Sequence, residues 1–212
     1  MTNWDKDIKI LNNIGVATFS YVPKSIIDYL QFCIDNRKNL ENRQNYLAGH
    51  IKEEYGTTPS NEFNNFIVNS IENNDICRTH ANKIDVLKKN LPFYCESLWF
   101  NFQKKHEFNP VHFHEGVFSF VIFMQIPYNL NDEDLVFPDV NKKNNSLSST
   151  SRLAFLSTNR MGTIEKTLCN VDESYLHKMV VFPAKLLHLV YPFYTSDKER
   201  ITVSGNIKLL VN

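Results

Sequence analysis

The sequence has no excess of charge of either sign, no long apolar run and no closely spaced cysteine pair. Its 23 Lys and Arg residues equal its 23 Asp and Glu residues, so the formal net charge is zero. Balanced charge argues against a protein whose main task is to neutralise a nucleic-acid backbone, although a local basic patch stays compatible with it. No segment approaches the roughly 18 apolar residues of a membrane-spanning helix. We therefore expect neither a membrane nor a nucleic acid as partner.

Cysteine is sparse, and its spacing is uninformative for metal binding. The four cysteines form no C-x-x-C motif; they are Cys33, Cys77, Cys95 and Cys169. The first residues are polar and lead into no apolar segment, so we expect no signal peptide. Free thiols are then favoured over disulfides. This indicates a cytoplasmic protein.

The composition excludes disorder and fibrous structure. Of the 212 residues, 42% are hydrophobic and 22% are charged, and glycine is rare, with 6 residues against 16 phenylalanines. This length and composition suit a single globular domain. We predict an N-terminal strand and helical support region over residues 1–92, followed by a β-rich core over residues 93–212.

Hydrophobic periodicity supports this division. The expected helices begin at Pro23 and cover residues 61–73 and 77–89. We expect residues 39–60 to be irregular, and residues 129–151 to be a surface connection with one short strand around residues 135–137. The expected strands cover residues 8–21, with an interruption near 12–13, and then 94–103, 117–126, 152–157, 178–182, 187–193 and 200–210. Helices followed by antiparallel strands predict an α+β fold with a sandwich or barrel core.

Two histidines stand two residues apart, in the sequence Asn109-Pro-Val-His112-Phe-His114-Glu115. Side chains at i and i+2 of a strand point to the same face, so His112 and His114 converge if this segment is extended. A third imidazole from a distant strand, His188, completes a set of three. Imidazole and carboxylate ligands suit Fe(II) oxygen chemistry, and zinc also accepts imidazoles. By itself the H-x-H pair is weak evidence, about as compatible with solvated loop residues.

The last expected strand has one wholly polar face. Its members alternate with apolar residues; they are Arg200, Thr202, Ser204 and Asn206. An ordinary solvent-facing side also gives this pattern. The alternative is a carboxylate clamp, because a guanidinium pairs two oxygens at once. Asn101 lies on the polar face of another expected strand, where it can hydrogen-bond a carboxylate.

Together these motifs resemble the 2-oxoglutarate/Fe(II)-dependent oxygenases, in particular the small prolyl-4-hydroxylase-like members of bacteria and marine phages. The resemblance covers roughly the second half of the chain. Its residues are Trp99-x-Asn101, Asn109-Pro-x-His112-x-His114, Ser119-x-Val121, Phe182-Pro-x-x-Leu186-Leu187-His188-x-Val190-x-Pro192 and Glu199-Arg200-x-x-x-Ser204-x-Asn206. The resemblance also raises a virus-encoded protein in the host cytoplasm as an alternative.

The resemblance implies a double-stranded β-helix, or jelly-roll, with the N-terminal helices packed on it. It also implies Fe(II) held by an H-x-D/E…H triad, 2-oxoglutarate as co-substrate beside O2, and a peptide or small-molecule substrate. Carried over, His112 and His188 are metal ligands. Arg200 is the partner of the distal 2-oxoglutarate carboxylate, with Asn101, Thr202, Ser204 and Asn206 around the co-substrate.

The chain departs from the family pattern at the carboxylate ligand, where His114 stands. Three alternatives stay open: His114 ligates, Glu115 takes its place, or water fills the third position. Strand parity favours His114. Two rival functions also remain. One is a three-histidine cupin-type dioxygenase that uses no 2-oxoglutarate, and the other is a metal-binding jelly-roll without activity.

Overall fold

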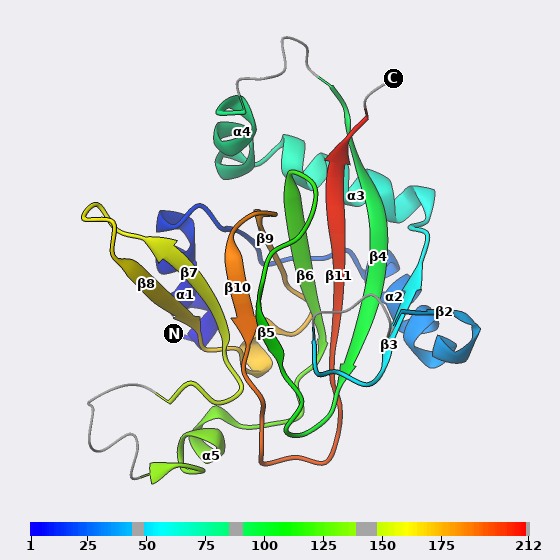
Figure 1. Ribbon diagram of the computed structural model, residues 1–212. Coiled ribbons are helices and arrows are strands. Elements are labelled where there is room, and N and C mark those ends of the chain that lie inside the picture. The colour runs from blue at the N-terminus through cyan, green and yellow to red at the C-terminus, as the bar shows by residue number, and fades with distance from the viewer. Residues whose placement is uncertain (44–48, 85–90, 139–147, 211–212) are drawn as a thin grey trace.

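Two antiparallel β-sheets face each other in the computed structural model, which describes residues 1–43, 49–84, 91–138 and 148–210. The larger sheet has the strand order β1-β9-β6-β11-β4-β3-β2, and the smaller sheet has the order β5-β10-β7-β8 (Figure 1). This is the jelly-roll arrangement expected from the resemblance. The strands are β1 (Ala17–Phe19), β2 (Glu41–Asn42), β3 (Glu54–Thr57), β4 (Phe93–Gln103), β5 (Asn109–His112), β6 (Phe118–Gln125), β7 (Leu153–Thr158), β8 (Ile164–Cys169), β9 (Met179–Pro183), β10 (Leu187–Val190) and β11 (Arg200–Leu209).

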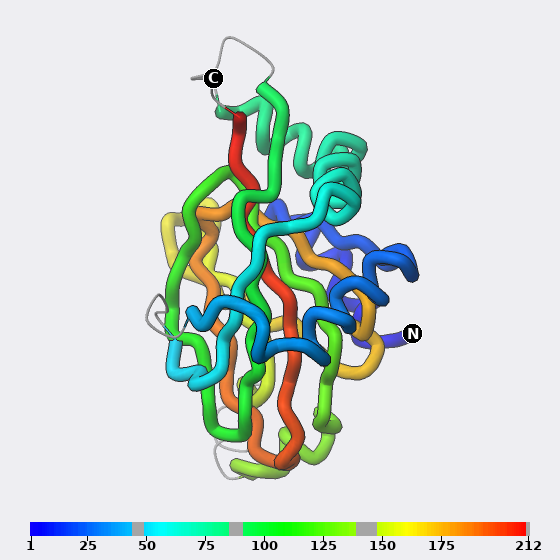
Figure 2. The backbone as a smooth tube through the Cα atoms, turned by 90° about the vertical axis from the view of Figure 1, so that its right-hand side faces the viewer, coloured from blue at the N-terminus to red at the C-terminus, as the bar shows by residue number. Residues whose placement is uncertain are grey.

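Helices cover the face of the larger sheet that points away from the smaller sheet (Figure 2). They are α2 (Lys24–Asp35), α3 (Asn61–Glu72) and α4 (Asp75–Asn82). The apolar residues of these helices join those of β4, β6 and β11 in one buried cluster. Gly205 makes part of this packing possible, because a Cβ there would lie 2.5 Å from the Phe120 ring. No helix in the described parts of the chain is long and apolar enough to cross a membrane.

The other core cluster lies between the two sheets and under α1 (Asn3–Asn13). Its largest members include Trp4, Phe123 and Tyr175, whose rings meet edge to face. The predicted strand over residues 8–21 is therefore wrong for its first half, since residues 3–13 form α1. The helix begins with a capping box in which Thr2 and Asp5 bond each other's backbone. That local signal outweighs the β-prone isoleucines.

Three other expectations need correction. Residues 39–60 are not wholly irregular, since β2 and β3 extend the larger sheet. Strand β8 was not anticipated; its exposed positions carry charged residues and give little apolar periodicity. The short strand expected at residues 135–137 is absent, and the helix α5 (Leu130–Asp134) precedes this point.

The segment 129–151 is also less superficial than expected. Glu133 is fully buried, and its carboxylate accepts hydrogen bonds from the backbone N–H groups of Tyr194 and Thr195. It therefore anchors the chain between β10 and β11. The helix expected over 77–89 is present as α4 up to Asn82, and its last residues fall outside the described ranges.

Candidate metal and co-substrate site

Three histidines meet on the inner side of the smaller sheet. His112 ends β5, His114 follows two residues later, and His188 lies on β10 directly opposite His112. One ring nitrogen of each lies within 4.8 Å of the others. Val111, Phe113 and Glu115 are exposed while His112 and His114 are not, so the alternation expected from strand geometry continues past the end of β5.

Backbone carbonyls fix two of these rings. His112 Nδ1 lies 2.7 Å from the carbonyl oxygen of Pro110, and His188 Nδ1 lies 3.0 Å from that of Leu186. An Nδ1–H that donates to a carbonyl leaves the Nε2 lone pair free, which is the usual arrangement of metal-binding histidine. The Nε2 atoms of His114 and His188 are 3.2 Å apart. Two imidazoles bound side by side at about 2.1 Å from one metal place their nitrogens about 3 Å apart. The donor set therefore fits a first-row divalent metal such as Fe(II).

Burial keeps the three imidazoles neutral. Desolvation lowers the pKa of His112. It lowers the pKa of His114 to about 4, with a smaller contribution from His112. The pKa of His188 falls to about 3, again mainly through desolvation. Neutral imidazole is the form that binds metal, so no proton has to leave these rings at neutral pH.

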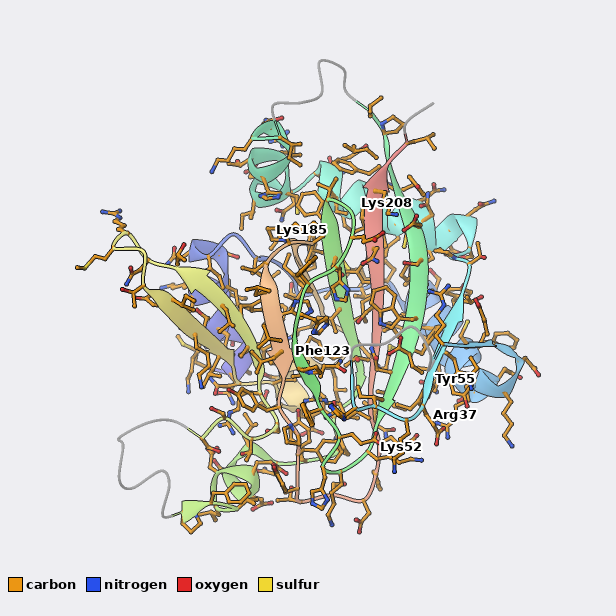
Figure 3. The ribbon with its side chains drawn as sticks, in the orientation of Figure 1. Arg37, Lys52, Tyr55, Phe123, Lys185 and Lys208 are labelled. Carbon is orange, nitrogen blue, oxygen red and sulfur yellow. The ribbon has the colours of Figure 1, made fainter. Side chains whose placement is uncertain are left out.

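Glu115 does not join the cluster. Its side chain is 81% exposed and lies 3.5 Å from the ammonium group of Lys208, which is labelled near the upper part of β11 in Figure 3. Gly116 follows with a φ of 95°, a left-handed conformation that turns the chain towards β6. Of the two alternatives at the carboxylate position, the structure places His114 beside His112 and His188 and turns Glu115 outwards.

Arg200 is buried in the same cavity without a counter-ion. It is 3% exposed, and the described residues offer it no carboxylate partner. Its Nε and Nη2 both donate to Gln103 Oε1, at 3.0 and 2.5 Å. Its Nη1 donates to Tyr128 Oη at 3.0 Å and to the carbonyl oxygen of Ser151 at 2.7 Å. All these acceptors are neutral, so the guanidinium keeps its full charge for an anionic ligand.

Four of the five residues predicted around the co-substrate line the cavity: Arg200, Asn101, Thr202 and Ser204. Asn101 Nδ2 lies 3.4 Å from Thr202 Oγ1, and its buried Oδ1 has no partner. Asn206 does not reach the cavity; its amide oxygen accepts from Ser119 Oγ at 3.4 Å. Asn206 faces the same way as Ser204 but lies further along β11, beyond the end of the cavity.

Sequence reasoning missed several residues of the site. Gln103 and Tyr128 hold the guanidinium of Arg200, and neither was assigned a role. Trp99 was expected to be core packing, yet it lines the cavity with its ring 5.3 Å from that of His114. Phe123, labelled near the centre of Figure 3, closes the wall between the sheets. Alternation along β4 placed Gln103 and Trp99 on the correct face; no sequence signal marked Tyr128.

A jelly-roll with three converging imidazoles and a buried, unpaired arginine has the architecture of the non-haem iron oxygenases. Residues 97–206, slightly more than half of the chain, match the family model described as "Putative 2OG-Fe(II) oxygenase", and the chain belongs to this family. It is accordingly an oxidoreductase of the Fe(II)- and 2-oxoglutarate-dependent dioxygenases. A search of curated proteins finds no match.

Solved structures support the fold. A prolyl-4-hydroxylase from Pseudomonas putida has a TM-score of 0.53 at 14% identity, with 97% of this chain and 98% of that chain covered. A 2OG-Fe(II) oxygenase family oxidoreductase from Burkholderia pseudomallei gives 0.51 at 11% identity, with 98% and 90% covered. A prolyl hydroxylase from Trichoplax adhaerens, solved with a peptide fragment of the hypoxia inducible factor oxygen degradation domain, gives 0.50 at 10% identity, with 99% and 94% covered.

Proposed function

We propose that His112, His114 and His188 hold Fe(II), that Arg200 binds the distal carboxylate of 2-oxoglutarate, and that the enzyme hydroxylates a peptide or small-molecule substrate. The observation that carries this proposal is the presence, in one cavity, of a three-imidazole cluster and a buried guanidinium with only neutral partners. The first suits a metal and the second suits an anion.

Each residue has a definable task. The carbonyls of Pro110 and Leu186 keep His112 and His188 in the tautomer that presents Nε2. Gln103 orients the guanidinium of Arg200, which can then pair both oxygens of a carboxylate. Bound at this site, Fe(II) and 2-oxoglutarate supply oxidative chemistry in which O2 is reduced, the co-substrate becomes succinate and CO2, and the substrate gains a hydroxyl group. The surrounding apolar walls, including Phe123 and Phe182, exclude water from the reacting groups.

A peptide substrate is supported by the Trichoplax adhaerens hydroxylase, whose structure holds a peptide. At 10% identity this likeness concerns the fold, and fold alone is a poor guide to substrate. A small molecule therefore stays within the proposal.

The experiment is to incubate the protein, prepared without oxygen, with Fe(II), 2-oxoglutarate and then O2, and to quantify succinate and CO2. We expect turnover that depends on both iron and 2-oxoglutarate. Absence of turnover together with absence of iron binding would overturn the proposal.

One alternative deserves its own measurement because His114 replaces the family's carboxylate. A three-histidine dioxygenase that needs no 2-oxoglutarate would use Arg200 to bind a carboxylate of its substrate. Oxygen consumption that proceeds equally well without 2-oxoglutarate would favour this alternative.

A further inference from the structure

The inference starts from the charge inside the cavity and rests on the proposed function. Among the described residues, those that line the cavity include no aspartate and no glutamate, and their one permanent charge is Arg200. The remaining polar groups are neutral; they are Trp99, Asn101, Gln103, Asn109, Thr202, Ser204 and the three histidines. The lining is therefore cationic before any metal binds.

Metal and co-substrate do not balance this charge. A divalent metal and Arg200 contribute three positive charges, because neutral imidazoles add none. The 2-oxoglutarate dianion contributes two negative charges, so one positive charge stays uncompensated. Where His114 stands, a carboxylate ligand would have removed that excess. An unbalanced charge in a buried site is costly, and an anion from outside relieves it.

Nearby acidic residues do not supply the missing charge. Glu54 pairs with Asn101 across β3 and β4 and is buried, but desolvation raises its pKa to about 8, so it is mostly protonated at neutral pH. Glu107 accepts a hydrogen bond from the backbone N–H of Lys104, outside the cavity lining. Glu115 points into solvent beside Lys208.

We infer that this site takes a monoanionic group next to the metal, in addition to 2-oxoglutarate. Neutral donors for it are available in the cavity, since Asn101 and Asn109 both line it. The monoanion has two sources with the same chemistry: a small anion from solution, or a carboxylate carried by the substrate. The second source would make the substrate an acid, such as an amino acid or the C-terminus of a peptide.

The experiment uses the full chain loaded with Co(II), which allows work in air, and saturated with 2-oxoglutarate. Formate, N-acetylglycine and neutral N-acetylglycinamide are titrated in turn by calorimetry at neutral pH. Ionic strength is held constant with a perchlorate salt, because exposed charges respond to salt. The visible spectrum of Co(II) reports whether an anion enters the coordination shell.

We expect the carboxylates to bind and the amide not to bind. Tighter binding of N-acetylglycine than of formate identifies a substrate carboxylate as the source, and the reverse order identifies a solution anion. His114→Asp removes the excess charge and should weaken carboxylate binding by about tenfold or more. The matched control Glu115→Gln changes an exposed acid next to His114 and should bind as the wild type does.

The possible failures are distinct. If Co(II) does not bind, the metal site is wrong, and both the proposed function and this inference fall. If Co(II) and 2-oxoglutarate bind but no carboxylate does, or if N-acetylglycinamide binds equally well, this inference alone is overturned. The comparison of acid and amide needs only the wild-type protein, so it stands even if His114→Asp does not fold.

Discussion

His112 and His188 face each other across two antiparallel strands. The register of β5 and β10 pairs their backbones directly, and their ring centroids are 4.2 Å apart. Both rings are held by carbonyls two residues earlier in their own segments. The metal site is therefore built on paired strands, which hold ligands more rigidly than loops do.

Replacing either member of this pair should remove the metal. We expect His112→Ala and His188→Ala to lower Fe(II) or Co(II) affinity by at least about a hundredfold, because two imidazoles cannot close a facial set. Equilibrium dialysis with metal analysis measures this directly. His80→Gln is a suitable control, since His80 lies on α4, against Phe118 on the opposite face of the larger sheet. Unchanged metal content in both alanine variants would contradict the assignment.

Arg200 should determine the affinity for 2-oxoglutarate. Arg200→Lys keeps the charge but loses the planar fork that bonds Gln103, Tyr128 and Ser151. Charge-assisted hydrogen bonds contribute about 1.5–3 kcal/mol, so KM for 2-oxoglutarate should rise roughly tenfold to a hundredfold. Steady-state kinetics with varied 2-oxoglutarate tests this. An unchanged KM would show that the co-substrate does not contact Arg200.

Gln103 should set how available Arg200 is. Its Nε2 donates to the carbonyl of Glu107, which turns Oε1 towards the guanidinium. Gln103→Glu places a carboxylate there as an internal competitor, whereas Gln103→Met only removes the acceptor. We expect 2-oxoglutarate to stabilise Gln103→Glu against heat much less than Gln103→Met, because ligand binding raises stability in proportion to affinity. Equal thermal shifts in the two variants would contradict the role of charge.

Glu54 should make the protein less stable as pH rises. Burial raises its pKa to about 8, above the model value of 4.5. Between these two values the folded state binds the proton and the unfolded state has lost it, so the free energy of unfolding falls as pH rises through this window. Glu54→Gln keeps the shape without the titration. It should flatten the pH dependence of urea unfolding and add up to a few kcal/mol near pH 8. An identical pH dependence in variant and wild type would show that Glu54 is ionised in the folded protein.

Alternation along single strands identified most of the site from the sequence. It placed Asn101 and Gln103 of β4, and Arg200, Thr202 and Ser204 of β11, on one face, and that face does line the cavity. It also turned His112 and His114 the same way and Glu115 the other way. These inferences hold because the orientation of a strand residue depends on local backbone geometry.

Parity gives the face of a residue but not its position along the sheet. Asn206 was expected near the co-substrate, yet it lies beyond the cavity next to Ser119, where the pairing of β4 and β11 also shifts register. The partners of Arg200 show the same limit. Tyr128 and Ser151 come from segments that carry no strand pattern, and only the folded chain brings them together.

The sequence by itself determined the ligand types, the polar face of β11 and the β-rich second half, since each follows from local periodicity or residue chemistry. Only the tertiary structure decided that residues 3–13 are helical, that β3 brings Glu54 beside Asn101, and that His114 joins His112 and His188. These outcomes depend on packing between segments far apart in the chain, where burial and strand register outweigh local preference.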